Sequence, residues 1–267
     1  MPKIIAIANQ KGGVGKTTTA INLGTALAAV GKSVLLIDLD PQGNASTGLG
    51  IDAEKRAIST YDLMMTGAAL EDVVCETQIP KLLIAPATTD LSSVDIELAS
   101  LENRATQLRR ILNAEALAPF ALDYVLIDCP PSLNLLTVNA MVAATSVLVP
   151  LQSEFFALEG LSQLMLSIRE VRQSANRDLR IEGVVLTMFD NRNNLSRQVE
   201  LDVRENLGEL VYNTIIPRNV RLSEAPSFAM PALIYDHTSK GSVAYQKLAA
   251  EMLRRHAQQS RAEKVRG

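Results

Sequence analysis

The chain has 267 residues, of which 47% are apolar and 21% charged, a composition typical of a globular protein that buries a sizeable core. It has no tryptophan and only 4% aromatic residues, which argues against nucleic-acid binding by base stacking. A formal net charge of −3 excludes a uniformly basic protein, so any contact with DNA must come from a local basic patch.

The sequence carries no pattern of export or membrane insertion. The first predicted strand follows Met1 almost directly, without a signal peptide, and no apolar run approaches the roughly 18 residues of a membrane-spanning helix. The two cysteines, Cys75 and Cys129, do not suggest a disulfide framework. We therefore expect one globular domain, residues 1–267, in the cytoplasm.

The N-terminal stretch predicts a strand, a glycine loop and a helix in immediate succession. Residues 4–8 form a short apolar run rich in β-branched side chains, as in a buried strand. Gly12, Gly13 and Gly15 allow a tight turn that brings backbone N–H groups close to an anion. From Thr17 the apolar residues recur at helical spacing. The stretch therefore predicts a phosphate cradle, because loop amides and helix dipole both favour negative charge there.

Two side chains complete this cradle. Lys16 is expected to reach the β- and γ-phosphates of a nucleotide, and Thr17 to offer its hydroxyl to Mg²⁺. The loop departs from the usual pattern G-x-x-x-x-G-K-[ST], because Gln10 occupies the first glycine position and Lys11 stands directly before the glycines. The alternative is a glycine-rich turn with two solvated lysines, and the agreement of strand, loop and helix argues against it.

Acidic residues follow two further predicted strands, over residues 33–38 and 124–128. The carboxyl ends of strands in an open α/β sheet face the ligand crevice. Asp128 therefore fits the position that holds a water of the Mg²⁺ shell, and Asp38 is a further candidate for that shell or for pairing with a loop lysine. Asp40 is a candidate to position the water that attacks the γ-phosphate. The alternative for Asp38 and Asp40 is a purely local role as loop caps.

The rest of the chain continues the alternation of strands and helices. Further strands are predicted over residues 82–86, 146–150, 181–189 and 211–216. Helices are predicted over residues 59–65, 70–74, 135–144, 158–174 and 195–207, with a long helix from about Asp90 to Leu117. This alternation predicts an α/β fold, a doubly wound and mainly parallel sheet with helices on both faces.

The run Lys11-Gly12-Gly13-Val14-Gly15-Lys16-Thr17-Thr18 resembles the deviant Walker A motif of the ParA/MinD ATPase family. Nearly the whole chain, from about residue 3 to about residue 255, resembles the ParA/Soj branch of that family. The resemblance implies a P-loop NTPase fold, with ATP and Mg²⁺ bound by this run. It implies that Lys11 crosses to the phosphates of a partner subunit when two subunits close face to face over two ATP molecules.

The same resemblance assigns residues elsewhere in the chain. The aspartate at the position of Asp40 is needed for hydrolysis in the family, and the surrounding D-x-D-P-Q-G-N pattern is present here. Lys11, Lys16 and Asp40 are then the catalytic residues. The segment with Pro217 and Asn219 is expected to hold the adenine ring.

DNA contacts are expected on a face that carries Arg192 and Arg221. By charge alone residues 169–221 would form a solvated mixed face, because nine arginines stand beside eight acidic residues. The resemblance instead implies that these two arginines bind DNA without sequence preference. The helix and tail from about residue 239 are more clearly basic, with Lys247 as a further candidate for DNA contact.

The implied function is an ATP hydrolase that dimerises with ATP and then binds double-stranded DNA non-specifically on the nucleoid. A ParB-type centromere-binding partner would stimulate its slow hydrolysis, and the cycle would drive chromosome or plasmid partitioning without a membrane.

Three other functions are weighed against this one. A MinD-like membrane ATPase would need an amphipathic C-terminal helix, but residues 257–267 have only Val265 as a larger apolar group. A metabolic kinase or an amidoligase-type enzyme, such as a dethiobiotin synthetase relative, would need an acceptor pocket that no motif indicates. A nucleotide-dependent scaffold without turnover would not need Asp40.

Overall fold

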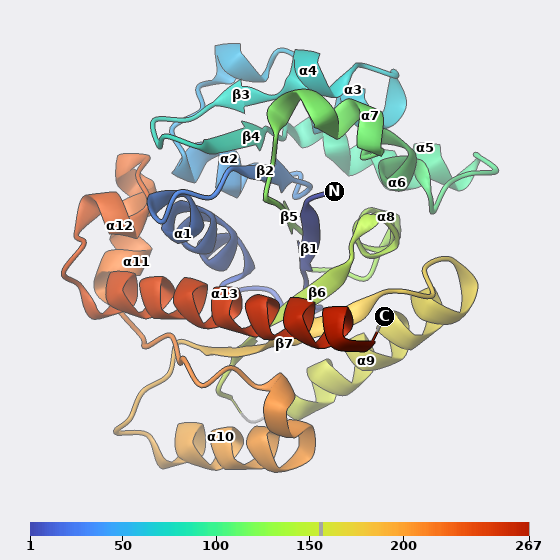
Figure 1. The fold of residues 1–267 in the computed structure, drawn as a ribbon. Coiled ribbons are helices and arrows are strands. Elements are labelled where there is room, and N and C mark those ends of the chain that lie inside the picture. Colours follow the sequence, from blue (N-terminus) through green and yellow to red (C-terminus); the bar gives the residue numbers. More distant parts are fainter. Residues whose placement is uncertain (155–156, 267) are drawn as a thin grey trace.

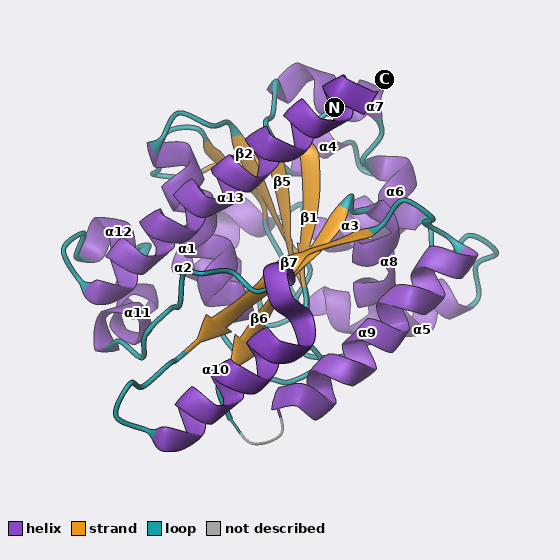
Figure 2. Cartoon of the chain, turned by 60° about the horizontal axis from the view of Figure 1, so that its bottom comes forward, coloured by secondary structure: helices purple, strands orange, loops and turns teal. Residues whose placement is uncertain are grey.

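The structure is a computed structural model that describes residues 1–154 and 157–266, with side chains described up to residue 262. In this part of the chain seven strands form one sheet in the order β3-β4-β2-β5-β1-β6-β7, and all neighbours are parallel except β3 and β4 (Figures 1 and 2). The predicted mainly parallel sheet is confirmed. The strands are β1 (Lys3–Ile7), β2 (Val34–Asp38), β3 (Cys75–Glu76), β4 (Leu82–Ala85), β5 (Tyr124–Asp128), β6 (Ser146–Gln152) and β7 (Arg180–Thr187).

Helices cover both faces of the sheet, as expected of a doubly wound fold (Figure 1). On one face α1 packs against the long C-terminal helix α13, and on the other lie α5, α6, α8 and α9. The α-helices are α1 (Lys16–Ala29), α2 (Asn44–Gly48), α3 (Thr60–Met65), α4 (Leu70–Val73), α5 (Val94–Ala99), α6 (Gln107–Ile111), α7 (Ala114–Leu117), α8 (Leu135–Ala143), α9 (Ala157–Ser174), α10 (Asn194–Leu207), α11 (Val220–Glu224), α12 (Ala232–Tyr235) and α13 (Lys240–Arg266).

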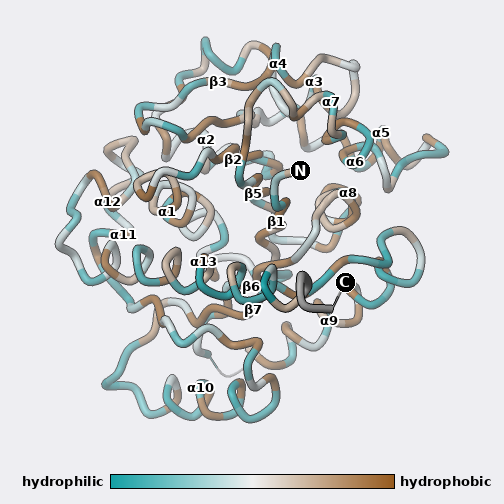
Figure 3. Tube along the Cα trace, in the orientation of Figure 1, coloured by the Kyte–Doolittle hydropathy of each residue, from teal (hydrophilic) through white to brown (hydrophobic). Residues whose placement is uncertain are grey.

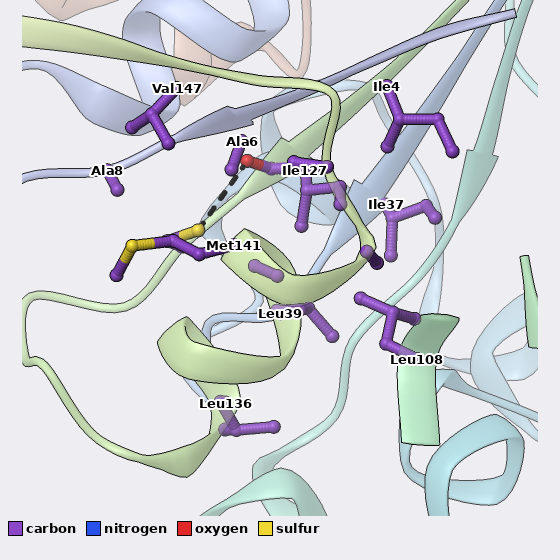
Figure 4. Packing of buried hydrophobic residues seen from close by; sticks show 14 of the residues in the cluster. Ile4, Ala6, Ala8, Ile37, Leu39, Leu108, Ile127, Leu136, Met141 and Val147 are labelled. Carbon is purple, nitrogen blue, oxygen red and sulfur yellow. Dashed lines mark hydrogen bonds between the residues drawn. The ribbon is translucent and has the colours of Figure 1, made fainter. Parts of the chain in front are cut away.

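The central strands are buried on both faces, so their side chains alternate between two apolar clusters. In β2, Val34 and Leu36 belong to the cluster beneath α1 and α13, whereas Leu35 and Ile37 belong to the opposite cluster. Figure 3 shows the hydrophobic central strands between more hydrophilic outer helices, and Figure 4 shows the second cluster from close by. Because β5 pairs in parallel with both β1 and β2, the loops that follow these three strands meet at one edge of the sheet.

The prediction of one long helix from about Asp90 to Leu117 is wrong. The chain forms α5, α6 and α7 instead, with turns between them. The buried side chain of Asn139, on α8, inserts at the break: its Nδ2 donates to the carbonyl of Arg104 at 2.7 Å, and its Oδ1 accepts from the N–H of Leu108 at 3.2 Å. In a continuous helix these two backbone groups would bond to each other. A tertiary contact therefore replaces a helical hydrogen bond.

The prediction of a strand over residues 211–216 is also wrong. Near both ends of this segment, backbone N–H groups do donate hydrogen bonds to β7. Its middle is held by α13. The Glu251 carboxylate accepts from the N–H groups of Asn213 and Thr214 at 2.8 and 2.9 Å. Because a side chain takes these donors, the segment crosses beside β7 without forming a regular ladder.

The C-terminal helix α13 carries the basic segment expected from about residue 239. Its exposed side chains include Lys240, Lys247, Arg254 and Arg261. The side chains of Lys264 and Arg266, which belong to the same expected basic tail, lie outside the described residues. In the part of the chain that the structure covers, no helix combines the length and apolar character needed to cross a membrane.

Candidate functional site

The glycine loop after β1 forms the centre of the candidate site. Gly13 and Gly15 have φ angles of +72° and +86°, in the left-handed region that favours glycine, and α1 begins directly after Gly15. No described side chain caps the N-terminus of α1. The amides of its first turn therefore remain available to an anion, as the sequence predicts for a phosphate cradle.

Lys16 lies within this loop rather than in solvent. Lys16 is only 6% exposed, and its ammonium donates to the carbonyl oxygen of Lys11 at 3.0 Å. Burial lowers the pKa of Lys16, while the negative charges of Asp128 and Asp40 oppose this shift. The structure thus brings together the lysine and two of the aspartates that the sequence placed at separate strand ends.

Asp38 is fully buried at the end of β2, next to Asp128 in the register of β2 and β5. Its carboxylate accepts from the N–H and hydroxyl of Ser46, at 2.9 and 2.7 Å, and from the N–H of Asp40 at 3.2 Å. Burial raises the pKa of Asp38 to about 6, against the effect of these hydrogen bonds. The local capping role considered for Asp38 is therefore realised, and the contacts found in the structure include none with a loop lysine.

Asp128 differs from Asp38 because neither of its carboxylate oxygens has a hydrogen-bond partner among the described residues, although both are buried. Burial raises the pKa of Asp128 well above its ordinary range, and the neighbouring Asp38 raises it further, while Thr17 and Lys16 oppose the shift. A buried carboxylate without partners is costly unless a cation or its water shell completes it.

The donors near Asp128 fit a magnesium ion held as in P-loop proteins. The structure has no group of three or more His, Cys, Asp or Glu side chains within the described residues that could hold a metal by themselves. Such a group is not required, since Mg²⁺ keeps several waters and binds through one or two protein oxygens together with phosphates. Thr17 would supply such a protein oxygen, and Asp128 would hold a water of the Mg²⁺ shell.

Asp40 is 7% exposed in the turn that follows β2. Its Oδ1 accepts from the N–H of Gln42 at 3.0 Å, and its carbonyl oxygen accepts from the N–H of Gly43 at 2.9 Å. These bonds show that Asp40 also caps its loop. They hold its carboxylate on the side of the glycine loop, where its charge acts on Lys16.

A cavity of about 250 Å³ adjoins the glycine loop. It is lined by Gly15 and Thr18 on one side and by Pro217, Arg218 and Asn219 on another. The segment expected to hold the adenine ring therefore does lie beside the phosphate loop. The Oδ1 of Asn219 accepts from the N–H of Arg221 at 3.0 Å, so this residue also caps α11.

Sequence reasoning missed several residues of this cavity, among them Thr187, Met188 and Tyr245. Thr187 ends β7 and donates its hydroxyl to the carbonyl of Val14 at 2.8 Å, which attaches the glycine loop to β7. The position of Thr187 at a strand end was a signal that could have been used. The position of Tyr245, on α13, gave none.

The loop lysine Lys11 also has a partner that the sequence did not reveal. Its ammonium lies 2.6 Å from an oxygen of Glu154, in the turn between β6 and α9. Glu154 follows a predicted strand, as Asp128 does, and that placement was its only sequence signal.

The residues expected to contact DNA lie along neighbouring segments. An isolated bridge between Phe189 and Pro217 joins the loop that carries Arg192 to the segment that precedes Arg221. The Arg192 side chain is 90% exposed and pairs with Asp190, and the Arg221 side chain is 49% exposed. Arg221 forms ion pairs with the carboxylates of Glu224 and Asp236.

A groove of about 690 Å³ runs between α13 and the segment that follows β7. Asn191 lines one side, and Lys240, Lys247 and Arg254 line the helix side. The structure therefore places Lys247 on a groove that begins next to Arg192.

Comparison with known proteins shows the family to which the chain belongs. A family model described as an AAA domain matches residues 2–181. The chain is 60% identical over 254 residues to the chromosome partitioning protein ParA of Caulobacter vibrioides, covering 95% of this chain and 94% of that protein. It is 50% identical over 252 residues to the sporulation initiation inhibitor protein Soj of Bacillus subtilis, covering 94% and 98%.

A solved structure shares the fold over nearly the whole chain. It is that of cobyrinic acid a,c-diamide synthase from Mycobacterium smegmatis with bound ADP and magnesium, with a TM-score of 0.81, 37% identity and 95% of each chain covered. The glycine loop, the strand-end aspartates and the level of identity over most of the sequence all indicate the same family. The chain belongs to the ParA/Soj family of chromosome partitioning ATPases.

Proposed function

We propose that this chain hydrolyses ATP to control its own dimerisation and its binding to DNA, and that this cycle drives the partitioning of a chromosome or plasmid. The observation that carries the proposal is the convergence of Lys16, Asp128 and Asp40 at one edge of the sheet, in a chain that is 60% identical to a ParA protein. We propose further that residues 1–267 act as one ATPase unit with a basic C-terminal helix.

The hydrolytic step follows from the roles of the residues at the loop. Lys16 and the amides of residues 12–18 bind the nucleotide phosphates, and Pro217 and Asn219 border the space for the base. Thr17 would hold magnesium directly and Asp128 would hold it through a water, and the bound ion would neutralise phosphate charge. Asp40 orients the attacking water by accepting its hydrogen bond, while the buried walls of the site limit access of other waters.

Lys11 acts between subunits in this proposal. Two chains close with their glycine loops facing each other, and Lys11 of each reaches the nucleotide of its partner. The resemblance to ParA proteins supports this role, and Lys11 has no function in an ordinary P-loop. Hydrolysis removes the γ-phosphate that the two subunits share, and the dimer opens.

The DNA-binding face consists of Arg192, Arg221 and the groove along α13. Lys240, Lys247, Arg254 and Arg261 follow one another at intervals of seven residues, so they lie along one side of the helix. Exposed ion pairs such as Arg192–Asp190 contribute little and can be exchanged for phosphate contacts. A dimer presents this face twice, which raises the effective concentration of phosphate-binding groups.

The biological partner is a ParB-type centromere-binding protein that stimulates hydrolysis, and the place of action is the nucleoid in the cytoplasm. The membership of the chain in the ParA/Soj family supports these assignments, and one relative is named as a chromosome partitioning protein. A membrane surface is not part of the proposed cycle.

Co-sedimentation with DNA tests the proposal directly. The wild type and Asp40→Ala are compared with ADP or ATP at one fixed low salt concentration. We expect retention only with ATP, and stronger retention of Asp40→Ala because its ATP dimer cannot open by hydrolysis. Retention that does not depend on nucleotide would contradict control by dimerisation.

The separation of the two surfaces is tested by Arg192→Glu. We expect this variant to lose DNA retention by about tenfold or more while it still dimerises with ATP, because the Arg192 side chain is 90% exposed and its described contacts are with Asp190 rather than with the glycine loop. Light scattering of the ATP-bound protein measures the dimer, and loss of both properties would show that the two sites are not separate.

A further inference from the structure

The contact between Lys11 and Glu154 joins two segments that the mechanism treats separately. The Lys11 ammonium lies 2.6 Å from Glu154 Oε2 within the same subunit. Lys16, only five residues further on, turns its ammonium back to the carbonyl of Lys11 instead. The two lysines of the loop therefore have different anchors, and Lys11 is directed toward the end of β6.

Both ends of this ion pair are held by other contacts. On the loop side, the N–H of Lys11 donates to Asn9 Oδ1 at 3.0 Å, and Asn9 Nδ2 donates to the carbonyl of Pro150, in β6, at 2.8 Å. On the other side, Gln152 Nε2 donates to Glu154 Oε1. The start of the glycine loop is thus attached to β6, with the carboxylate fixed beside it.

The pair is nonetheless easy to exchange. The side chains of Lys11 and Glu154 are 40% and 47% exposed, so water screens their attraction. A pair of this kind changes an equilibrium by about fivefold at most, which is enough to bias a switch and too little to lock it.

We propose that Glu154 is a positioning residue that holds Lys11 within its own subunit and so opposes premature dimerisation. This inference rests on the proposed role of Lys11 across the dimer interface. For Lys11 to reach the partner's nucleotide, it must leave Glu154, and the phosphates of a bound nucleotide offer the competing negative charge. Glu154 thereby sets the ATP concentration at which dimers form.

The pair in the single subunit is tested first, independently of dimerisation. The ADP-bound protein is treated with an amine-acylating reagent, and modification of Lys11 is followed by mass spectrometry. We expect Glu154→Gln to raise the acylation rate of Lys11 by about threefold, because the Lys11 side chain must leave the carboxylate before its amine can attack the reagent. Glu159→Gln is the matched control, since Glu159 is an exposed acid in the first turn of α9. An unchanged rate in Glu154→Gln would overturn the proposal.

Sedimentation with a non-hydrolysable ATP analogue tests the consequence. We expect Glu154→Gln to tighten the dimer by about fivefold per subunit, with Glu159→Gln unchanged. If Glu154→Gln leaves dimerisation unchanged or weakens it while Lys11→Gln abolishes it, the inference fails and the proposed role of Lys11 stands. If Lys11→Gln dimerises as the wild type does, the proposed role across the interface fails, and the inference fails with it.

Discussion

The two ends of the parallel sheet each bury a carboxylate, and the two carboxylates are in opposite situations. At the carboxyl ends of the strands, Asp128 has no hydrogen-bond partner for either oxygen among the described residues, and burial raises its pKa. At the amino ends of the strands, Glu182 lies near the start of β7, and its side chain is 7% exposed. Its carboxylate accepts from His256 Nε2 at 2.7 Å, from the Tyr212 hydroxyl at 3.1 Å and from the Ser146 hydroxyl at 2.8 Å.

Burial alone would raise the pKa of Glu182 as well. The hydrogen bond and charge of His256, together with the two hydroxyl donors, outweigh burial and lower it. His256 comes from α13, so the network attaches the C-terminal helix to the sheet. The comparison teaches that burial does not by itself mark a functional carboxylate: Glu182 is satisfied by three donors, whereas Asp128 has no hydrogen-bond partner for either oxygen among the described residues.

The largest effect is expected at the unsatisfied end, from Lys16→Ala. This change removes the buried cation of the glycine loop, and we expect nucleotide affinity to fall by about a hundredfold or more, because nothing else in the loop carries a positive charge to the phosphates at that position. Titration with a fluorescent ATP analogue measures the affinity. Binding within a few fold of the wild type would show that Lys16 does not face the phosphates.

The hydrogen-bonded carboxylate of Glu182 is tested by the variant Glu182→Gln. The amide keeps one acceptor oxygen, replaces the other with an NH₂ group and removes the negative charge, so at least one of the donors His256, Tyr212 and Ser146 loses its acceptor. We expect the free energy of unfolding to fall by about 3 kcal/mol, measured in urea without nucleotide. Asp128→Asn is the matched change at the other end, and it should alter stability by less than about 1 kcal/mol or increase it, because that carboxylate loses no partner. Equal losses in the two variants would break the comparison.

The pH dependence of stability should differ in sign between the two ends. The pKa of Asp38 rises from 3.8 to about 6 on folding, so the native state binds more protons between these values, and its contribution destabilises the fold as pH rises from about 4 to 6. The pKa of Glu182 is lowered from 4.5, so its stabilisation is complete above that pH and is lost as pH falls below it.

Urea unfolding of the wild type and Asp38→Asn across this window measures the first effect. We expect the difference in stability between the two proteins to change by about 2–3 kcal/mol from pH 4 to 6, as a shift of about two pKa units implies. A constant difference would show that Asp38 titrates with an ordinary pKa.

Sequence reasoning succeeded where short stretches determine their own structure. The glycine loop needs left-handed backbone at Gly13 and Gly15, and the strands that precede Asp38 and Asp128 are apolar runs whose ends in a parallel sheet must meet at one edge. The fold class and the left-handed glycine loop were predictable for that reason.

It failed where a distant side chain competes with the local pattern. Asn139 takes the place of a helical hydrogen bond between residues 104 and 108, and Glu251 takes two donors from the expected last strand. Neither competitor can be recognised from the segment that it changes. Glu154 was missed for a related reason, since its pairing with Lys11 spans 143 positions of the chain.

The sequence by itself determined the alternating elements, the glycine loop and the acidic strand ends, because backbone conformation and hydrophobic period act over a few residues. Only the tertiary structure decided which carboxylates are satisfied, which segment closes the cavity beside the glycine loop and where Lys11 is held. Those properties depend on hydrogen bonds and charges between residues far apart in the sequence, and these form only when the sheet has brought the residues together.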